Sequence, residues 1–260
     1  MDVILTAGGV PSPKDSLHTA SQGGYKAMIN LNGRPMIQWV LDALSQAKSI
    51  ERIILVGLPP MTNLYCAKPI IIVEEQGDLL SNVRAGCHEV AGHNPSATHT
   101  LLVAADIPLL TPEMVDWMAS QVAEGNSDMY YALVERNLIE KAYPGARKVF
   151  ISLKDLQVCS GEVNAIRLSL AVSDQPFWQR LVEARKNPLK LASVAGYDTM
   201  FLLRLGTRSL DAVEKGVQER FGFSCRALLS PYPEIAVDVD KPFQLEIAST
   251  ALRKRAGASA

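Results

Sequence analysis

Two glycine-rich stretches near the start of the chain put small residues and a lysine where they can meet a phosphate. The first is Thr6-Ala7-Gly8-Gly9, which follows the apolar run Val3–Leu5, and the second is Gly23-Gly24-Tyr25-Lys26. Glycine lets a backbone approach a base or a phosphate closely, and a lysine after such a loop can reach a phosphate as a point charge. The first stretch is neither G-x-G-x-x-G nor a P-loop, since Pro11 and Pro13 prevent a helix there and no G-K-[ST] follows. Taken by itself, it is equally explained as a plain turn between a strand and a helix.

Carboxylates stand at two further points where polar chemistry is possible. Asp106 ends the apolar run Leu101–Ala105 and precedes Ile107-Pro108, so it is expected at the end of a buried strand. Asp238 and Asp240 are separated by one residue and would point to the same side of a strand. Each carboxylate also has a structural explanation, which is a capping role near the start of the helix that follows it.

The elements that would position these residues alternate along the first half of the chain. Continuous apolar runs, which suit strands covered on both faces, occur at Val3–Leu5, Ile53–Val56, Ile70–Val73 and Leu101–Ala105. Apolar residues at helical spacing fill the ranges 37–44, 79–90 and 111–122, the last with Thr111 as the expected N-cap. This order predicts βαβ units and a mostly parallel sheet, and ligands bind such sheets at the carboxyl ends of the strands. The polar residues above are therefore expected to meet at that edge.

The pattern changes in the second half of the chain. The expected strands are 148–151, 163–170, 225–229 and 235–237, and the expected helices are 177–185, 189–194, 210–221 and 242–254. No repeat, low-complexity segment or linker separates the two halves, so we expect a single domain over residues 1–260.

In this order, the segments resemble those of the nucleotidyltransferase superfamily, which includes MobA-like molybdenum-cofactor guanylyltransferases, cytidylyltransferases and sugar-phosphate pyrophosphorylases. The resemblance is carried by Ala7-Gly8-Gly9, by the loop that ends in Lys26, and by Gly33-Arg34-Pro35-Met36-Ile37 before a helix. The segments 76–86, 103–111 and 235–245 also agree with the family, and the last is similar to its closing D-[IV]-D-T-P-E-D-L. The resemblance implies an α/β fold with a Rossmann-like, mostly parallel mixed sheet flanked by helices. It also implies transfer of NMP from an NTP to a phosphorylated or hydroxyl-bearing small molecule, with release of pyrophosphate.

The same resemblance implies roles for individual residues of the nucleotide site. Asp106 and Asp240 would hold Mg²⁺, with Asp238 as the second choice, because this ion prefers hard oxygen ligands and takes one or two protein carboxylates. Lys26 would draw charge from the transferring phosphoryl group. The nucleotide-binding residues would be Thr6, Ala7, Gly8, Gly9, Gln76, Gly77, Ser81 and Asn82. Asp78, in the same segment, is also explained as a plain helix cap.

Two shorter matches imply where the acceptor binds. Leu138-Ile139-Glu140-Lys141 resembles the "E-K" strand of the sugar-phosphate pyrophosphorylases, and Gly161-Glu162-Val163-Asn164 resembles their "E-x-N" segment. Glu140 and Asn164 are therefore expected to bind hydroxyl groups of the acceptor, by accepting and donating hydrogen bonds. On this basis, residues 1–130 are the expected nucleotide-binding core, 131–231 the acceptor-binding region, and 232–255 the strand and helix that complete the core.

The chain departs from the family in its first loop. The family's loop reads G-x-G-x-R-[MF]-G-x-x-K, whereas the loop here lacks the arginine and its lysine comes several residues later. Lys14 is the expected catalytic replacement, as a charge without the two-pronged geometry of arginine. A degenerate nucleotide-binding module without turnover is therefore one alternative. A glycosyltransferase that uses a nucleotide sugar is another, although its usual D-x-D pair is absent at Asp106.

Composition narrows the class of protein further. Apolar residues make up 48% and charged residues 20% of the 260 residues, which is typical of a folded globular protein. The formal net charge of -1 argues against a nucleic-acid-binding surface, while permitting a local basic pocket. No signal peptide and no apolar stretch approaching the ~20 residues of a membrane span are found, so we expect a cytoplasmic protein that binds neither nucleic acid nor membrane. The sequence does not indicate an oligomeric state.

Overall fold

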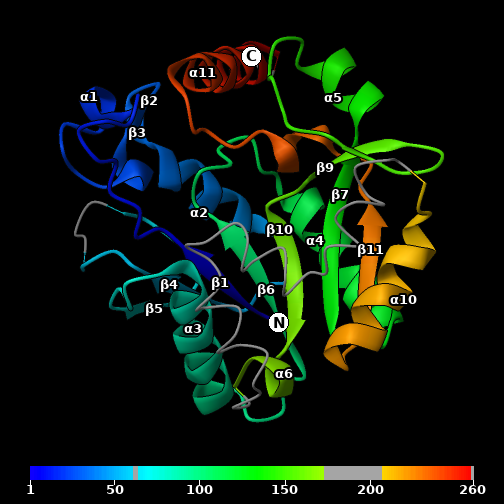
Figure 1. The fold of residues 1–260 in the computed structure, drawn as a ribbon. Coiled ribbons are helices and arrows are strands. Elements are labelled where there is room, and N and C mark those ends of the chain that lie inside the picture. Colours follow the sequence, from blue (N-terminus) through cyan, green and yellow to red (C-terminus); the bar gives the residue numbers. More distant parts are fainter. Residues whose placement is uncertain (61–63, 173–206, 259–260) are drawn as a thin grey trace.

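A mixed β-sheet with helices on both faces forms the centre of the molecule (Figure 1). The computed structural model describes residues 1–60, 64–172 and 207–258. Along the sheet the strands are β5 (Ile70–Val73), β4 (Arg52–Val56), β1 (Asp2–Thr6), β6 (His99–Ala104), β10 (Val163–Arg167), β7 (Met129–Glu135), β9 (Gln157–Ser160) and β8 (Ile151–Ser152). β11 (Cys225–Leu229) pairs with β7, and β2 (Asn30–Leu31) and β3 (Arg34–Pro35) form a separate small hairpin. The α/β prediction is thereby confirmed.

The strands from β5 to β6 are parallel, whereas β10 runs antiparallel between β6 and β7. β11 is parallel to β7, and β9 is antiparallel to β7. Because β10 is reversed, its first residues lie beside the carboxyl end of β6, with Val163 opposite Val103. The sheet thus brings the 161–164 segment to the edge where the parallel strands end.

Alternate residues of the core strands pack against different helices. Val3 and Leu5 belong to the apolar cluster that includes α2 (Met36–Gln46) and α4 (Pro112–Glu124). Ile4 packs on the opposite face with α3 (Leu79–His93) and α6 (Leu168–Val172). The continuous apolar runs of the sequence therefore reflect burial on both faces, as expected for a parallel core.

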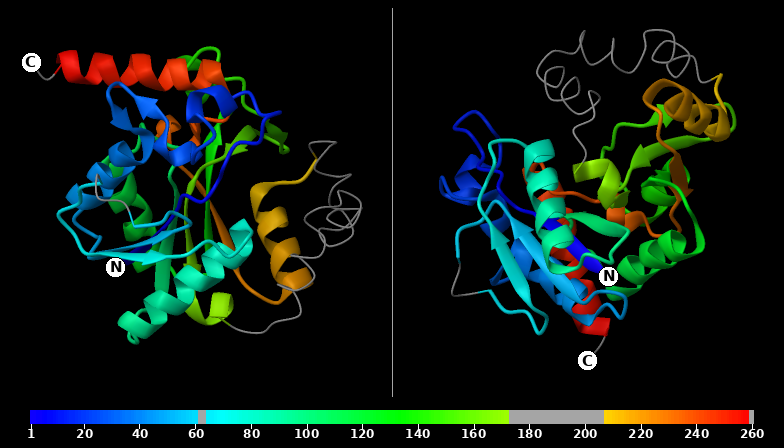
Figure 2. Two further views of the ribbon diagram at one scale, coloured as in Figure 1. Left: turned by 90° about the vertical axis from the view of Figure 1, so that its left-hand side faces the viewer. Right: turned by 90° about the horizontal axis from the view of Figure 1, so that it is seen from below.

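The last helix closes the structure over the N-terminal third of the chain. α11 (Pro242–Ala258) lies beside the segment that carries β2 and β3, as Figure 2 shows. Asn32 and Ser249 are joined by two hydrogen bonds, of 2.9 and 2.6 Å, and an apolar cluster including Leu31 and Leu252 lies between the two segments. This contact brings the residues just before α11 next to Lys26.

The remaining helices are α1 (His18–Ser21), the 3₁₀ turn η1 (Lys26–Met28), α5 (Arg136–Ala142), α10 (Leu210–Phe221) and the 3₁₀ turn η2 (Pro233–Ala236). The predicted helix 210–221 and strand 225–229 are confirmed. The helices predicted at 177–185 and 189–194 lie outside the described residues. The division of the chain into three functional regions stays a prediction.

Four segments expected as strands differ in the structure. Residues 138–141 are helical within α5, where Arg136 and Glu140 form an ion pair one helical turn apart. Residues 235–236 belong to the turn η2, because Pro233 begins a 3₁₀ helix, so a strand there is wrong. Only Ile151 of the range 148–151 is in a strand, and the range 163–170 ends as a strand at Arg167 before α6 begins.

Candidate active site

A cleft of about 430 Å³, here called the main cleft, opens where β1 and β6 end side by side. β1 continues to β4 and β5 on one side, while β6 lies on the other, so the chain changes direction at this point of the sheet. Ligands of open α/β sheets bind at such a switch point. The cleft is lined mainly by the ends of β1 and β6, by the loop after β1, by η1 and by α3, with residues Thr6, Ala7, Gly8, Gly9, Lys26, Ala27, Glu75, Leu79, Asn82, Val83, Leu102, Val103, Ala104, Ala105, Asp106, Glu162 and Asn164.

The loop after β1 is shaped by a close approach between two glycines. A Cβ atom on Gly57, whose φ is +98°, would lie 2.5 Å from both the Cα and the nitrogen of Gly8. A Cβ atom on Gly8 would in turn meet the Glu75 carboxyl carbon at 3.1 Å. The Lys26 amide donates to the Gly9 carbonyl at 2.8 Å. The loop backbone is therefore fixed at the floor of the cleft, with Lys26 tied to it.

Lys26 links the two carboxylates that the sequence predicted as metal ligands. Its Nζ lies 2.6 Å from Asp106 Oδ2 and 2.5 Å from Asp240 Oδ1. The Val239 amide donates to the Asp106 carbonyl at 2.9 Å, and the Asp240 amide donates to Gln244 Oε1 at 2.9 Å. These backbone contacts explain how residues more than a hundred positions apart reach one ammonium group.

The charges of this triad stabilise one another. Burial opposes the charge on Lys26, but the carboxylates of Asp106 and Asp240 outweigh burial and raise the pKa of the ammonium. Burial also acts to raise the pKa of Asp240, but the hydrogen bond from Lys26 outweighs it and lowers that pKa. The Asp240 side chain is 57% exposed and that of Asp106 is 25% exposed, so both carboxylates remain open to solvent and ligands.

A second lysine–aspartate pair lies beside the first. Lys148 forms an ion pair with Asp238, and both side chains are largely buried. Glu162 lines the main cleft nearby, and burial, followed by the charges of Asp106 and Asp238, raises its pKa to about 7. Lys148 was not predicted from the sequence and no local motif marks it. Glu162 belongs to the E-x-N motif, and only its placement reveals that it faces the other carboxylates.

Asp238 and Asp240 lie close together for a different reason from the one predicted. They follow the turn η2 in backbone that is not a strand, so the alternation of side chains along a strand does not apply. Each instead faces its own lysine, Asp238 with Lys148 and Asp240 with Lys26. Within the described residues, no group of three or more His, Cys, Asp or Glu side chains is arranged to hold a metal ion.

Other predicted nucleotide residues shape the start of α3. Asn82 lines the main cleft, and its Oδ1 accepts a hydrogen bond of 2.7 Å from the Gln76 amide. Gly77 has a φ of +84°, and the Ser81 hydroxyl donates to Asp78, the residue that caps the helix. Gln76, Gly77 and Ser81 are not among the residues that line the cleft. The structure therefore brings Asn82 to the cleft, places Gln76 and Gly77 in the loop before α3, and places Ser81 in the first turn of that helix.

The two predicted acceptor residues lie in different places. Asn164 lines the main cleft, where its Oδ1 accepts from the Ala132 amide at 2.9 Å and its Nδ2 donates to the Gly161 carbonyl at 3.1 Å. Glu140 is on the outside of α5, where it pairs with Arg136 in a separate hollow of about 280 Å³. Asn164 is thus at the predicted site and Glu140 is not.

Lys14 also lies apart from the main cleft. It is exposed within the turn that Asp15 and Ser12 close by hydrogen bonds, and it lines none of the hollows described here. A hollow of about 320 Å³, here called the outer hollow, adjoins the main cleft and shares Gly9 and Lys26 with it. A larger cavity of about 650 Å³ between the 142–147 loop and α11 contains none of the predicted site residues.

A parallel-core sheet with a glycine loop, a lysine and paired carboxylates at its carboxyl edge is the arrangement of a nucleotide-binding α/β enzyme. Residues 3–175, well over half of the chain, match the MobA-like NTP transferase domain. The chain belongs to this family, and it is an enzyme of the nucleotidyltransferase type. The predicted family is thereby confirmed.

Known proteins with similar sequences and folds agree with this assignment. A relative from Thermococcus sibiricus (strain DSM 12597 / MM 739), named probable molybdenum cofactor guanylyltransferase, is 25% identical over 150 residues, which are 56% of this chain and 74% of that protein. A solved structure from Thermus thermophilus, called a hypothetical transferase, is 31% identical with a TM-score of 0.81, covering 94% of this chain and 98% of that one. The structure of CMP:2-keto-3-deoxy-manno-octonic acid synthetase complexed with CTP shares the fold, with 14% identity, a TM-score of 0.59, and coverage of 98% and 99% of the two chains.

Within the described residues, no helix combines the length and the apolar character needed to cross a membrane.

Proposed function

We propose that this protein is a Mg²⁺-dependent nucleotidyltransferase that transfers NMP from an NTP to a phosphorylated or hydroxyl-bearing small molecule and releases pyrophosphate. The observation that carries the proposal is the Lys26 ammonium held between Asp106 and Asp240 at the end of the Gly8-Gly9 loop. The match to the MobA-like NTP transferase domain and the CTP-bound structure of similar fold support it. The relative from Thermococcus sibiricus carries the name of a guanylyltransferase, which makes GTP the first nucleotide to test.

The chemistry of Asp106 and Asp240 fits a magnesium ion. Both present carboxylate oxygens, which are hard ligands, and one oxygen of each contacts the same ammonium, so a single cation can contact both. Magnesium usually keeps waters and takes one or two carboxylates, in agreement with a site that offers two. When bound, the ion supplies positive charge to the phosphate oxygens around the α-phosphorus.

Different residues of the main cleft bind different parts of the nucleotide. The backbone of Gly8 and Gly9 holds the phosphates, and Leu79 and Val83 give an apolar wall for the nucleoside beside Asn82. With a cation held by Asp106 and Asp240, Lys26 would be available to contact the transferring phosphoryl group. Transfer at phosphorus needs alignment and charge neutralisation rather than a covalent intermediate, and these groups provide both.

The acceptor binds on the side of the cleft formed by Glu162 and Asn164. Glu162 directly precedes β10, Asn164 is the second residue of that strand, and both line the main cleft with Asp106, so an acceptor oxygen between them would face the α-phosphorus. The ion pair of Lys148 and Asp238 lies near Glu162, and the charges of both residues act on the Glu162 carboxyl group. A polar wall of this kind supports a phosphorylated or hydroxyl-rich acceptor over an apolar one.

The proposal is tested by measuring pyrophosphate release with each of the four NTPs, Mg²⁺ and a panel of phosphorylated and hydroxyl-bearing acceptors. Release is expected with one NTP, abolished by EDTA, and strongly reduced in Lys26→Met. Lys215→Met, which changes an exposed lysine on α10, is the matched control and is expected to behave as wild type. No release with any combination, together with nucleotide binding that ignores Mg²⁺, would overturn the proposal.

A further inference from the structure

The main cleft adjoins the outer hollow. The two share Gly9 and Lys26, so a ligand whose transferring group lies at Lys26 extends from one into the other. The outer hollow is formed by the loop after β1 and by the residues before α11, and it is lined by Gly9, Val10, Pro11, Asp15, Leu17, Lys26, Asp240 and Lys241. With the nucleoside against Leu79 and Asn82, the outer hollow is where the far end of a triphosphate lies.

Four charged side chains line the outer hollow, and three of them are already engaged. Lys26 is bound to Asp106 and Asp240. Asp15 accepts a hydrogen bond of 2.6 Å from the Ser12 amide. Hydrogen bonding from Ser12 lowers the pKa of the Asp15 carboxyl group. The charge of Lys241 contributes to the lowered pKa of Asp15, but within the described residues the ammonium of this lysine has no hydrogen bond and no ion pair. Lys241 is therefore the cation that remains available to a ligand.

The backbone of Lys241 is fixed although its ammonium is not. Its carbonyl accepts from the amides of Gln244 and Leu245 at 3.0 and 3.1 Å, so the residue is tied to the first turn of α11. The neighbouring Asp240 amide is held by Gln244. The side chain therefore starts from a defined point at the rim of the outer hollow, and only its own rotamers have to be ordered when a ligand binds.

The sequence around Lys241 supports a special role for this lysine. The closing family motif has threonine after its second aspartate, whereas this chain has Lys241. The first loop lacks the arginine of the family's loop, which the resemblance implies is a phosphate contact, and Lys14, the replacement expected from the sequence, lies apart from both hollows. The change in the first loop removes a cation from the expected phosphate site, and the change in the closing motif adds Lys241 close to it.

We propose that Lys241 binds the β- and γ-phosphates of the NTP and the departing pyrophosphate, as a positioning residue in place of the missing arginine. This inference rests on the proposed function. In the reaction, the acceptor oxygen bonds to the α-phosphorus as the bond from that phosphorus to the bridging oxygen breaks. The electron pair leaves with pyrophosphate, the group that faces Lys241, and a hydroxyl acceptor releases its proton to water. A lysine supplies charge there without the two-pronged geometry of arginine.

The test is calorimetric titration of the full-length protein with inorganic pyrophosphate in the presence of Mg²⁺, since this probe needs no knowledge of the base. Lys241→Gln is expected to weaken pyrophosphate binding about 10-fold, as for the loss of one charge-assisted contact. Lys241→Arg should retain the affinity, and Lys215→Gln on α10 is the matched control. NMP binding should be unchanged in Lys241→Gln, because the lysine lies beyond the α-phosphate; a general loss of structure would weaken both ligands.

The same variants separate this inference from the proposed function. Unchanged pyrophosphate binding in Lys241→Gln overturns the inference, as does a loss found in Lys14→Gln instead. If the wild-type protein turns over and Lys241→Gln has the same turnover rate and the same KM for the NTP, the inference is overturned while the proposed function stands. Pyrophosphate binding that depends on Lys241 in a protein without any turnover supports the inference and overturns the proposed function.

Discussion

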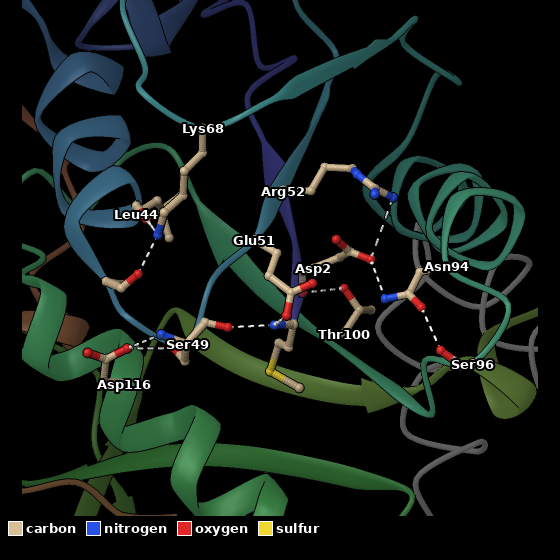
Figure 3. A network of polar contacts seen from close by, with 12 residues as sticks. Asp2, Leu44, Ser49, Glu51, Arg52, Lys68, Asn94, Ser96, Thr100 and Asp116 are labelled. Atoms are coloured by element: carbon tan, nitrogen blue, oxygen red, sulfur yellow. Dashed lines mark hydrogen bonds and ion pairs between the residues drawn. The ribbon is translucent and has the colours of Figure 1, made fainter.

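Charged side chains lie at both ends of the parallel strands, here called the amino edge, where the strands begin, and the carboxyl edge, where they end. The partners of these side chains differ between the two edges. At the amino edge, shown in Figure 3, Asp116 accepts hydrogen bonds from the amides of Lys48 and Ser49 and from the Ser49 hydroxyl. Asp2, buried at the start of β1, receives a hydrogen bond of 3.2 Å from Asn94 and forms a long ion pair of 4.0 Å with Arg52. At the carboxyl edge, by contrast, the carboxylates face lysine ammonium groups.

This difference separates groups that hold the fold from groups that can change partners. A backbone amide cannot leave a carboxylate without a change of the chain, whereas a lysine side chain can turn away when a cation or phosphate arrives. Asp116 therefore joins α4 to the segment before β4, while Asp106 and Asp240 remain exchangeable. If this comparison holds, an aspartate-to-asparagine substitution affects stability at the amino edge and activity at the carboxyl edge.

The largest expected effect is the loss of activity in Asp106→Asn. The asparagine removes one of two carboxylates at the proposed cation site, and pyrophosphate release should fall by roughly 10²–10³-fold, as for the loss of a main electrostatic contribution to catalysis. The free energy of unfolding should change by less than about 1 kcal/mol, because Lys26 keeps Asp240 and the carboxylate is partly exposed. Initial rates and urea denaturation measure the two quantities.

Asp116→Asn is the matched control, since it makes the same chemical change at the amino edge. If Asp106→Asn instead unfolds the protein as readily as Asp116→Asn does, the carboxyl edge is also structural and the comparison fails. If both variants keep full activity, Asp106 has no part in transfer.

The parallel strands β1, β4, β5 and β6 could be predicted from the sequence because each contains a continuous apolar run, whereas β7 and β9 were not predicted. Asp106 and the Gly8-Gly9 loop were found in the same way, since each directly ends such a run. The apolar pair Leu138-Ile139 was ambiguous, because a short run fits a helix as well as a strand, and the pairing of Arg136 with Glu140 belongs to the helix.

The long-range contacts of the site could not be predicted from spacing. Lys26 and Asp240 are 214 positions apart and Lys148 and Asp238 are 90 apart, and each pair depends on how α11 closes over the sheet. The availability of Lys241 and the engagement of Lys26 likewise depend on which side chains meet in space. Local patterns predicted the elements, whereas the tertiary structure determines which charges are free to act.

The second prediction concerns stability at the amino edge. Burial acts to raise the pKa of Asp116, but the hydrogen bonds from Ser49 and Lys48 outweigh it and hold that pKa below its ordinary value of 3.8. A lowered pKa in the folded state means that the stabilisation is present above the ordinary pKa and is lost as the pH falls through the lowered one. Asp116→Asn should therefore lower the free energy of unfolding by about 1–3 kcal/mol at neutral pH, with no change in activity below the melting temperature.

Urea denaturation at several pH values measures this effect. The difference between wild type and Asp116→Asn should begin to shrink as the pH falls below about 4, where the carboxylate is protonated in the unfolded state, and should be smallest below the lowered pKa of the folded state, where it is protonated in both states. A difference that stays constant down to strong acid would mean that the shape of the side chain, rather than its charge, stabilises the loop.

The third prediction concerns Glu162, a carboxyl group at the carboxyl edge whose ionisation is unfavourable in the folded protein. Burial and the neighbouring Asp106 and Asp238 raise its pKa to about 7, from an ordinary value of 4.5. Between these values the folded state holds a proton that the unfolded state has released, so the stability of the protein falls as the pH rises through this range. In EDTA, Glu162→Gln should therefore raise the melting temperature more at pH 8 than at pH 5. An equal change at both pH values would contradict the raised pKa.

The smallest effect is expected for Glu140→Gln, which separates the two predicted acceptor residues. Glu140 and Arg136 form an exposed pair one helical turn apart, with side chains 55% and 47% exposed, and such pairs contribute up to about 0.5 kcal/mol. Turnover and the KM for the acceptor should remain at wild-type values. Asn164→Asp, in contrast, places a carboxylate against the Gly161 carbonyl inside the main cleft and should raise the KM for the acceptor. If Glu140→Gln raises that KM and Asn164→Asp does not, the acceptor binds at the outside of α5, and the carboxyl edge of the sheet holds only the nucleotide.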